Sequence, residues 1–290
     1  MGGYLLTHNY ADAATLSTTT SGSMLRPLTE LQVKRARGLM RGPVNNSGGA
    51  AVLVIRADLG AAYPVACVGL VGLNAVTSIQ GSIYLSATGA GNSELASASI
   101  LWDDSWETPY GQSVWYFHGN GSAGAHVLAR YVQINLEVYG RDIAERYVEA
   151  RRLLIMGGML DSDGWDFDWS VLPNDMSTTE TTPKGGVFVA EEAGYRVVRF
   201  GLSGMTKAMA KTNLLDSNST DSLQRSLQLA GRHREVVVCP RYYDDSADPE
   251  MFYNAIYAQL QDWSPIEHTG GDTYACDSIT ANEIPHPPLS

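Results

Sequence analysis

The chain has 290 residues, of which 44% are hydrophobic and 18% charged, a composition ordinary for a globular protein. Its formal net charge of −11 argues against a phosphate-binding surface, because such surfaces concentrate Lys and Arg. With 29 glycines and abundant serine and threonine, the sequence predicts a β-rich fold with many turns.

The three cysteines, Cys67, Cys239 and Cys276, are far apart and form no Cys-x-x-Cys pair, which argues against a disulfide framework and a zinc site. We expect them to be buried as small apolar residues of a protein made in a reducing cytoplasm. The N-terminus lacks the basic and apolar regions of a signal peptide, and no apolar run approaches the ~20 residues of a membrane helix. We therefore expect neither export nor membrane insertion.

Residues 1–24 are rich in Thr, Ser and Ala, and they predict an N-terminal arm or a loose first strand. The runs 50–57, 64–73 and 77–87 are rich in β-branched or alternating apolar residues and predict three strands. A turn at Asp58-Leu59-Gly60 is expected to separate the first two strands.

The run Lys34–Arg41 (KRARGLMR) is the one candidate for a local basic patch in this acidic chain. We expect Lys34, Arg35, Arg37 and Arg41 to form a subunit interface, paired with an acidic face of a neighbour. A nucleic-acid contact is the less favoured alternative, so no nucleic-acid partner is expected.

Aromatic residues gather between Trp102 and Trp115, beside acidic ones. Clustered aromatic rings provide faces on which sugars stack, so Trp102, Trp106, Tyr110 and Trp115 are candidate carbohydrate contacts. The alternative is that these rings pack at the mouth of the fold or against a neighbouring subunit.

The stretch Ala129–Gly158 contains the clearest pattern in the chain. Alternation from Tyr131 to Val138 is the period-two pattern of a strand with one apolar face. A second β-rich run, Tyr147–Met156, follows a polar link and is expected to stop at Gly157-Gly158. We interpret the two runs as a pair of strands that closes a sandwich.

The acidic stretch DSDGWDFD offers four carboxylates, Asp161, Asp163, Asp166 and Asp168, as a weak calcium candidate. The bidentate Glu that completes a calcium loop is missing, so we favour a solvated turn and expect no metal and no cofactor. Residues 161–185 therefore predict a linker loop.

The second half predicts strands at 186–190, 195–202, 235–239 and 273–284, the first two joined by a turn at 191–194. Ser219–Ala230 predicts a helix with Ser219 or Thr220 as its N-cap and Gly231 at its C-terminal end. Residues 254–262 fit both a helix and a strand, and periodicity alone leaves the choice open.

Two resemblances cover most of the chain. The first half resembles galactose-binding-like (discoidin-type) jelly rolls of tailed-bacteriophage structural proteins, through Asp58-Leu59-Gly60, PVACVGLVGLN and ARYVQINLEV…YVEARRLLIMG. Ala150-Arg151-Arg152-Leu153 stands where Gly-Arg-Leu is usual in such endings. The second half resembles the partner module of such tail proteins, through YRVVRFGL, SLQRSLQLAGRHREVVVCP and Asn282-Glu283-Ile284. This likeness favours a strand at 254–262.

The resemblance implies a mainly β fold, with a jelly-roll sandwich at 25–160, followed after the linker by a smaller β-rich α+β, belt-like domain at 186–290 with one or two helices. It implies a non-enzymatic distal-tail or tail-tip subunit of the virion, forming a ring, hexameric in similar proteins, with the tail tube and hub proteins as partners. The alternative function is a carbohydrate-binding module for host-surface glycans. The absence of GxSxG, HExxH and phosphate-loop motifs agrees with a protein that is not an enzyme.

Overall fold

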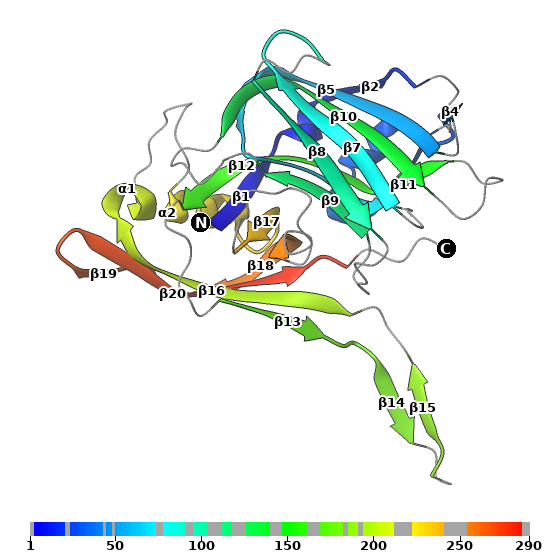
Figure 1. Cartoon of the computed structure of the whole chain (residues 1–290). Helices are drawn as coiled ribbons and strands as arrows, with labels where there is room; N and C mark the ends of the chain where they lie inside the picture. The colour runs from blue at the N-terminus through cyan, green and yellow to red at the C-terminus, as the bar shows by residue number, and fades with distance from the viewer. Residues whose placement is uncertain are drawn as a thin grey trace.

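The computed structural model describes residues 3–20, 24–42, 45–47, 50–73, 78–90, 95–103, 112–117, 126–139, 147–161, 169–181, 185–190, 194–211, 222–240 and 254–285. Over these residues the chain is mainly β, as predicted, and every pair of strands is antiparallel (Figure 1). The described part contains two α-helices, α1 (Lys207–Lys211) and α2 (Leu223–Ala230). None of its helices has the length and apolar character needed to cross a membrane.

Two large sheets contain most of the strands in the described part of the chain. The ten-stranded sheet runs in the order β13 (Ser170–Asn174), β16 (Tyr195–Thr206), β20 (Thr273–Glu283), β18 (Ile256–Trp263), β17 (Glu235–Cys239), β1 (Gly3–Asn9), β12 (Arg152–Asp161), β6 (Cys67–Leu73) and β9 (Gln112–Phe117), with β19 (Glu267–Gly270) on β20. The six-stranded sheet runs β2 (Thr15–Thr18), β5 (Ala50–Val65), β10 (Val127–Tyr139), β7 (Ser78–Ser86) and β8 (Ala96–Asp103), with β4 (Asn45–Ser47) on β5.

Two small sheets and three short 3₁₀ helices complete the structure. β3 (Met40–Gly42) pairs with β11 (Val148–Ala150), and β14 (Thr178–Thr181) pairs with β15 (Val187–Ala190). The 3₁₀ helices are η1 (Tyr10–Ala13), η2 (Leu28–Gln32) and η3 (Lys34–Ala36).

A sandwich core lies between the six-stranded sheet and the β12–β6–β9 part of the larger sheet. Inward-facing side chains such as Ile55 and Ile134 on one sheet and Leu70 and Ile155 on the other belong to one buried cluster. Alternation along β5 and β10 supplies this face, because every second residue of a strand points to the same side. The predicted sandwich is therefore present.

The stretch 129–158 differs from the predicted strand pair. β10 pairs with β5 and β7, whereas β12 pairs with β1 and β6, so the two strands lie in opposite sheets. β12 also continues through Gly157-Gly158 to Asp161 instead of stopping there. A Cβ on Gly157 would lie 2.4 Å from the carbonyl oxygen of Pro64, so this glycine allows a close approach of two backbones and does not end a strand.

Within the N-terminal segment, Gly3–Asn9 forms strand β1, as in the strand alternative of the prediction, but this strand is not loose. β1 hydrogen-bonds to β12 on one side and to β17 on the other, so it joins the first half of the chain to the second within one continuous sheet. Its side chains alternate between two buried clusters, with Leu5 in one and Tyr4 and Leu6 in the other. Burial on both faces makes β1 a central strand.

The region 161–185 contains more structure than a linker. β13 pairs with β16 and β14 pairs with β15. β15 and β16 are both strands, as predicted, but they belong to different sheets. The domain boundaries at 25–160 and 186–290 stay a prediction, although one sheet spans both segments.

Strand β18 confirms the strand alternative for residues 254–262. Helix α2 begins at Leu223, and its N-cap is Ser222, whose hydroxyl accepts a hydrogen bond from the Arg225 backbone N–H at 3.3 Å. The predicted caps, Ser219 and Thr220, lie outside the described residues. Gly231 ends the helix with φ 50°, as predicted.

The predicted turn Asp58-Leu59-Gly60 is a bulge inside β5. The register with β10 jumps between Ala129 and Tyr131, which leaves residues 59–62 opposite Arg130 alone. Gly60 has φ 82°, and Asp58 Oδ1 accepts a hydrogen bond from its N–H at 2.8 Å. The strand therefore resumes after a local loop.

Candidate functional site

The predicted carbohydrate residues are only partly within the described chain. Trp102 lies in β8, but its side chain is outside the described part, as are Trp106 and Tyr110 entirely. Trp115 lies in β9, is 5% exposed, and packs against Gly69 while its Nε1–H donates to Ser113 Oγ at 2.9 Å. Its ring belongs to a buried cluster, so its surface is not available to a sugar.

The calcium candidates are not tested. Asp161 ends β12 with an undescribed side chain, and Asp163, Asp166 and Asp168 lie outside the described residues. Among the residues that the structure does describe, no cluster of His, Cys, Asp and Glu could hold a metal ion.

The structure separates the four predicted basic interface residues into two groups. Arg41 forms an ion pair with the buried Glu149, and its guanidinium lies over the Tyr147 ring at 4.2 Å, so Arg41 is held within the chain. Lys34, Arg35 and Arg37 are exposed on and beside η3. These three remain candidates for contact with a partner.

The backbone that carries them is strained. Arg35 and Ala36 have φ values of 61° and 48°, a left-handed conformation that non-glycine residues rarely adopt. Such strain persists only where surrounding contacts impose it. Here the Arg35 backbone N–H donates a hydrogen bond to Glu235 Oε1 of β17, and the Ala36 side chain is buried. The segment is therefore fixed to the core.

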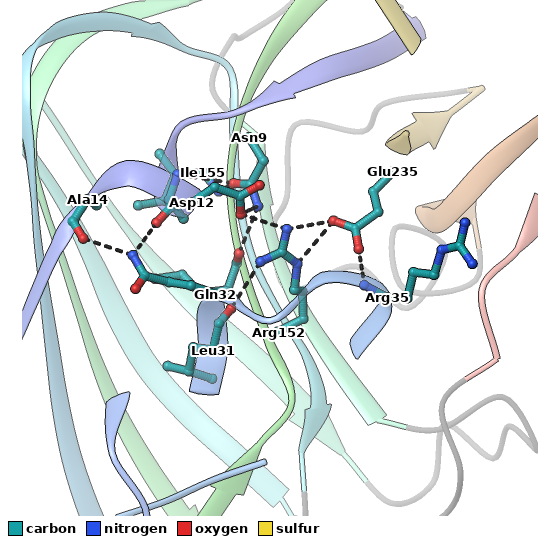
Figure 2. Close-up of polar contacts among 11 residues, drawn as sticks. Asn9, Asp12, Ala14, Leu31, Gln32, Arg35, Arg152, Ile155 and Glu235 are labelled. Carbon is teal, nitrogen blue, oxygen red and sulfur yellow. Dashed lines mark hydrogen bonds and ion pairs between the residues drawn. The ribbon is translucent and has the colours of Figure 1, made fainter. Parts of the chain in front are cut away.

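Glu235 belongs to a buried polar network around Arg152, the first residue of β12 (Figure 2). Arg152 is fully buried, and its Nη2 lies 2.5 Å from Glu235 Oε2 and 2.7 Å from Asp12 Oδ1. Its Nη1 also donates to the Leu31 carbonyl at 3.3 Å. One guanidinium thus joins η1, η2, β12 and β17.

Asn9 and Gln32 extend the network with backbone hydrogen bonds. Asn9 Oδ1 accepts from the Ile155 N–H at 2.9 Å, and Asn9 Nδ2 donates to the Leu153 carbonyl at 3.1 Å. Gln32 Nε2 donates to the carbonyls of Ala11 and Ala14 at 2.7 and 2.8 Å. These bonds hold η1 and η2 against the end of the sandwich.

Burial and neighbouring charges shift the pKa values of Asp12, Arg152 and Tyr257 in and beside the network. Burial raises the pKa of Asp12 despite the opposing charge of Arg152, so the ionised form of Asp12 is less favoured in the fold than in water. Burial acts to lower the pKa of Arg152, but the charges of Glu235 and Asp12 outweigh it and raise that pKa. Burial, and then the nearby Glu235, raise the pKa of the Tyr257 phenol. The site is a fixed ion pair in which Glu235 is the main partner.

This network suits a structural role better than a catalytic one. General acid–base chemistry needs a carboxyl group that can exchange a proton with a substrate. Glu235, however, is nearly buried and is occupied by Arg152 and by the Arg35 backbone. Arg152 and Glu235 each begin an apolar run in the sequence, which is an unusual place for a charged residue. That they form an ion pair across 83 positions could not be predicted from their spacing.

Three consecutive exposed apolar side chains lie on the β14–β15 hairpin. Val187, Phe188 and Val189 are 62%, 68% and 57% exposed and follow one another along β15. Figure 1 shows the hairpin extending away from the body of the molecule, beyond β13 and β16. Glu180 lies opposite Phe188, and Thr179 lies opposite Val189, so both faces of the hairpin are exposed and partly apolar.

A second aromatic group lies at the end of the sandwich. The rings of His8 and Tyr10 stack with centroids 6.2 Å apart, and those of Tyr10 and Tyr63 stack at 4.6 Å. Tyr63, beside the β5 bulge, is 37% exposed. Sequence spacing does not indicate this group, because Tyr63 is distant in the chain from His8 and Tyr10.

Comparisons with known proteins assign no family to the chain. No protein-family model and no curated protein matches it. Among solved structures, a family 32 carbohydrate-binding module from C. perfringens NanJ in complex with galactose is 13% identical, covering 53% of this chain and 99% of that one, with a TM-score of 0.37. A chitosan-binding module from a Paenibacillus sp. IK-5 chitosanase/glucanase is 16% identical over 52% of this chain and 99% of that one, with a TM-score of 0.37.

A mutant of the lectin binding domain of lectinolysin complexed with Lewis b is 14% identical, covering 52% of this chain and 96% of that one, with a TM-score of 0.35. The solved structures named here are thus sugar-binding modules that align with about half of the chain. At these TM-scores the likeness carries no argument about what this chain does.

Proposed function

We propose that this protein is a non-enzymatic structural subunit that assembles with copies of itself. The observation that carries the proposal is the β14–β15 hairpin, with three consecutive apolar side chains that are each more than half exposed. Val187 and Val189 lie on one face of the hairpin and Phe188 on the other, so each face exposes apolar surface of the kind that marks interaction sites.

The energetics of the hairpin support this role. Burying a Val or Phe side chain stabilises the folded or associated state by about 1.5–3 kcal/mol. Leaving three such side chains in water therefore loses several kcal/mol of possible stabilisation. An isolated two-stranded hairpin is also marginally stable. Both costs are removed if β14 and β15 pack against another chain.

The buried carboxylates support the non-enzymatic part of the proposal. In the described part of the chain, Glu235 is paired with Arg152, Glu283 with Arg196, and Glu149 with Arg41. A carboxylate fixed by an arginine is poorly suited to exchange protons with a substrate.

The finer proposal is the assembly itself. A ring at the tip of a bacteriophage tail, in contact with the tail tube and hub proteins in the virion, rests on the sequence resemblance alone. Its test is the position and copy number of this chain in a particle. A chain absent from virions would refute the tail assignment and leave self-assembly to be judged separately.

Self-assembly is tested by replacing Val187, Phe188 and Val189 together with Ser and measuring the mass of the native protein by light scattering after size exclusion. We expect the wild type to form oligomers and the variant to be a folded monomer. The matched control is Leu95→Ser/Leu128→Ser, which removes apolar side chains that are 38% and 39% exposed outside the hairpin. Retained oligomers in the hairpin variant would refute the role of the hairpin.

Glycan binding is the second candidate function. The described feature that favours it is the stacked group of His8, Tyr10 and Tyr63, because amphipathic aromatic rings with accessible surface suit sugar contact. A panel of host-surface glycans tests the idea, with Tyr63→Ala and Trp106→Ala as variants. No binding to any glycan of the panel, or binding that is unchanged in both variants, rejects the glycan-binding function.

A further inference from the structure

Arg151 is a half-buried arginine whose guanidinium has no hydrogen-bond or ion-pair partner within the described part of the chain. Its Nε atom is buried and makes no hydrogen bond. Four other buried or half-buried arginines, Arg41, Arg130, Arg152 and Arg196, each pair with a carboxylate. A cation that is partly withdrawn from water without a counter-charge costs free energy, so an anion from outside the chain would be stabilised there.

The backbone around Arg151 fixes where this guanidinium lies. Arg151 stands between β11 and β12, and its N–H donates a hydrogen bond to the Val71 carbonyl of β6 at 2.9 Å. The stem of its side chain packs over Gly72, because a Cβ built on that glycine would lie 2.8 Å from both Cγ and Cδ of Arg151.

Gly72 is suited to this close approach for a second reason. It has φ 68°, and the register of β6 with β9 shifts between Val71 and Leu73, so the backbone bulges at this glycine. The guanidinium of Arg151 is therefore carried on a stem that is packed against a bulge, at the end of β6.

The neighbouring charges leave Arg151 in excess. Glu149 is the acidic residue whose charge acts on Arg151, but it is buried and forms an ion pair with Arg41, which lies opposite it on β3. Two guanidinium groups thus share one carboxylate. Burial lowers the pKa of Arg151 despite the charge of Glu149, although an arginine stays protonated at neutral pH.

We propose that Arg151 binds an oxyanion, the carboxylate or phosphate group of a ligand, where β11, β12 and the end of β6 meet. A planar guanidinium donates two parallel N–H bonds to two oxygens of such a group. A side chain that is already packed in place loses little entropy on binding. The net charge of −11 opposes the approach of an anion only weakly, because charges beyond about 8 Å are screened at physiological ionic strength.

Thermal melts of the full-length chain test the site. Chloride is replaced stepwise by inorganic phosphate, or by acetate, at a constant ionic strength of about 0.15 M. The variants are Arg151→Met, which keeps an unbranched stem over Gly72, and Arg151→Lys, which keeps the charge and loses the planar fork. The matched control is Arg130→Met, which removes the same charge from a half-buried arginine that already has a partner, Asp58.

We expect the melting temperature of the wild type to rise and then saturate with a Kd of about 1–10 mM for at least one of the two anions, because a ligand that binds the native state stabilises it. Arg151→Met should show no saturating rise, and Arg151→Lys should bind about ten-fold more weakly because a lysine cannot form the bidentate contact. Arg130→Met should respond like the wild type. Saturation with phosphate alone or with acetate alone identifies which oxyanion the site takes.

Two results would overturn the anion site. One is a wild type that shows no saturating rise with either anion. The other is a rise of the same size in Arg151→Met, because a general effect of the salt would then explain it. The proposal does not rest on self-assembly, since it concerns a single copy. A monomeric chain that binds the anion refutes self-assembly alone, and an oligomer without the response refutes the anion site alone.

Discussion

Replacing Arg152 with Met tests the buried network that joins the two halves of the chain. The substitution puts an unbranched apolar side chain in place of the buried guanidinium and leaves Glu235, 9% exposed, without its counter-charge. It also removes the contacts of the guanidinium with Asp12 and the Leu31 carbonyl. Breaking a buried pair by removing one partner costs about 3–5 kcal/mol.

That cost is a large fraction of the total of about 5–15 kcal/mol expected for a folded domain. We therefore expect Arg152→Met to lower the midpoint of urea unfolding with little change in slope, measured by tryptophan fluorescence. The double variant Arg152→Met/Glu235→Gln should be more stable than Arg152→Met, because it no longer buries an unpaired charge.

The matched control is Arg130→Met. Arg130 pairs with Asp58 at 2.9 Å, but the two side chains are 41% and 35% exposed, and such pairs contribute about 0.2–1 kcal/mol. A loss below about 1 kcal/mol in Arg152→Met, equal to the control, would contradict the role given to the network.

Three further predictions follow from burial. Gly157→Ala should destabilise the fold by about 1–3 kcal/mol, because the added Cβ would lie 2.4 Å from the Pro64 carbonyl oxygen. The control Gly60→Ala adds a Cβ in open space and should cost only its backbone strain, so equal losses in urea unfolding would contradict the close approach at Gly157. Trp115→Ala should cost about 3–5 kcal/mol by calorimetry without changing any glycan affinity. Burial raises the pKa of the Cys67 thiol, so Cys67 should resist alkylation even at mildly alkaline pH until the chain unfolds. Rapid labelling of the native protein, detected by mass spectrometry of the peptide that contains Cys67, would contradict this prediction.

The strands that the sequence predicted well are those with strong local patterns. Alternation in β7 and β10 and the apolar run of β17 indicated their type, and each is a strand. β1 was not predicted as a central strand because its apolar group is short and is followed by a polar segment. Its role depends on partners 150 and more positions away, such as Gly158 and Val238, which no local pattern contains.

The candidate surfaces were predicted in part. The basic run was identified, and the structure shows that Lys34, Arg35 and Arg37 are exposed while Arg41 is paired with Glu149. β14 was interpreted as part of a linker because it consists of Thr and Glu, although Thr also favours strands, whereas β15 was predicted as a strand. That Val187–Val189 would be left exposed depends on the position of the hairpin beyond the sheet, which is a tertiary property.

The most direct test of the account is the mass of the purified wild-type chain by sedimentation equilibrium over a range of about 1–100 µM, where micromolar and weaker association becomes visible. Self-assembly predicts that the mass of the wild type exceeds the 31.3 kDa of one chain and rises with concentration toward that of a larger assembly. The Val187→Ser/Phe188→Ser/Val189→Ser variant should keep the mass of one chain at every concentration. A constant 31.3 kDa for the wild type across that range would contradict self-assembly.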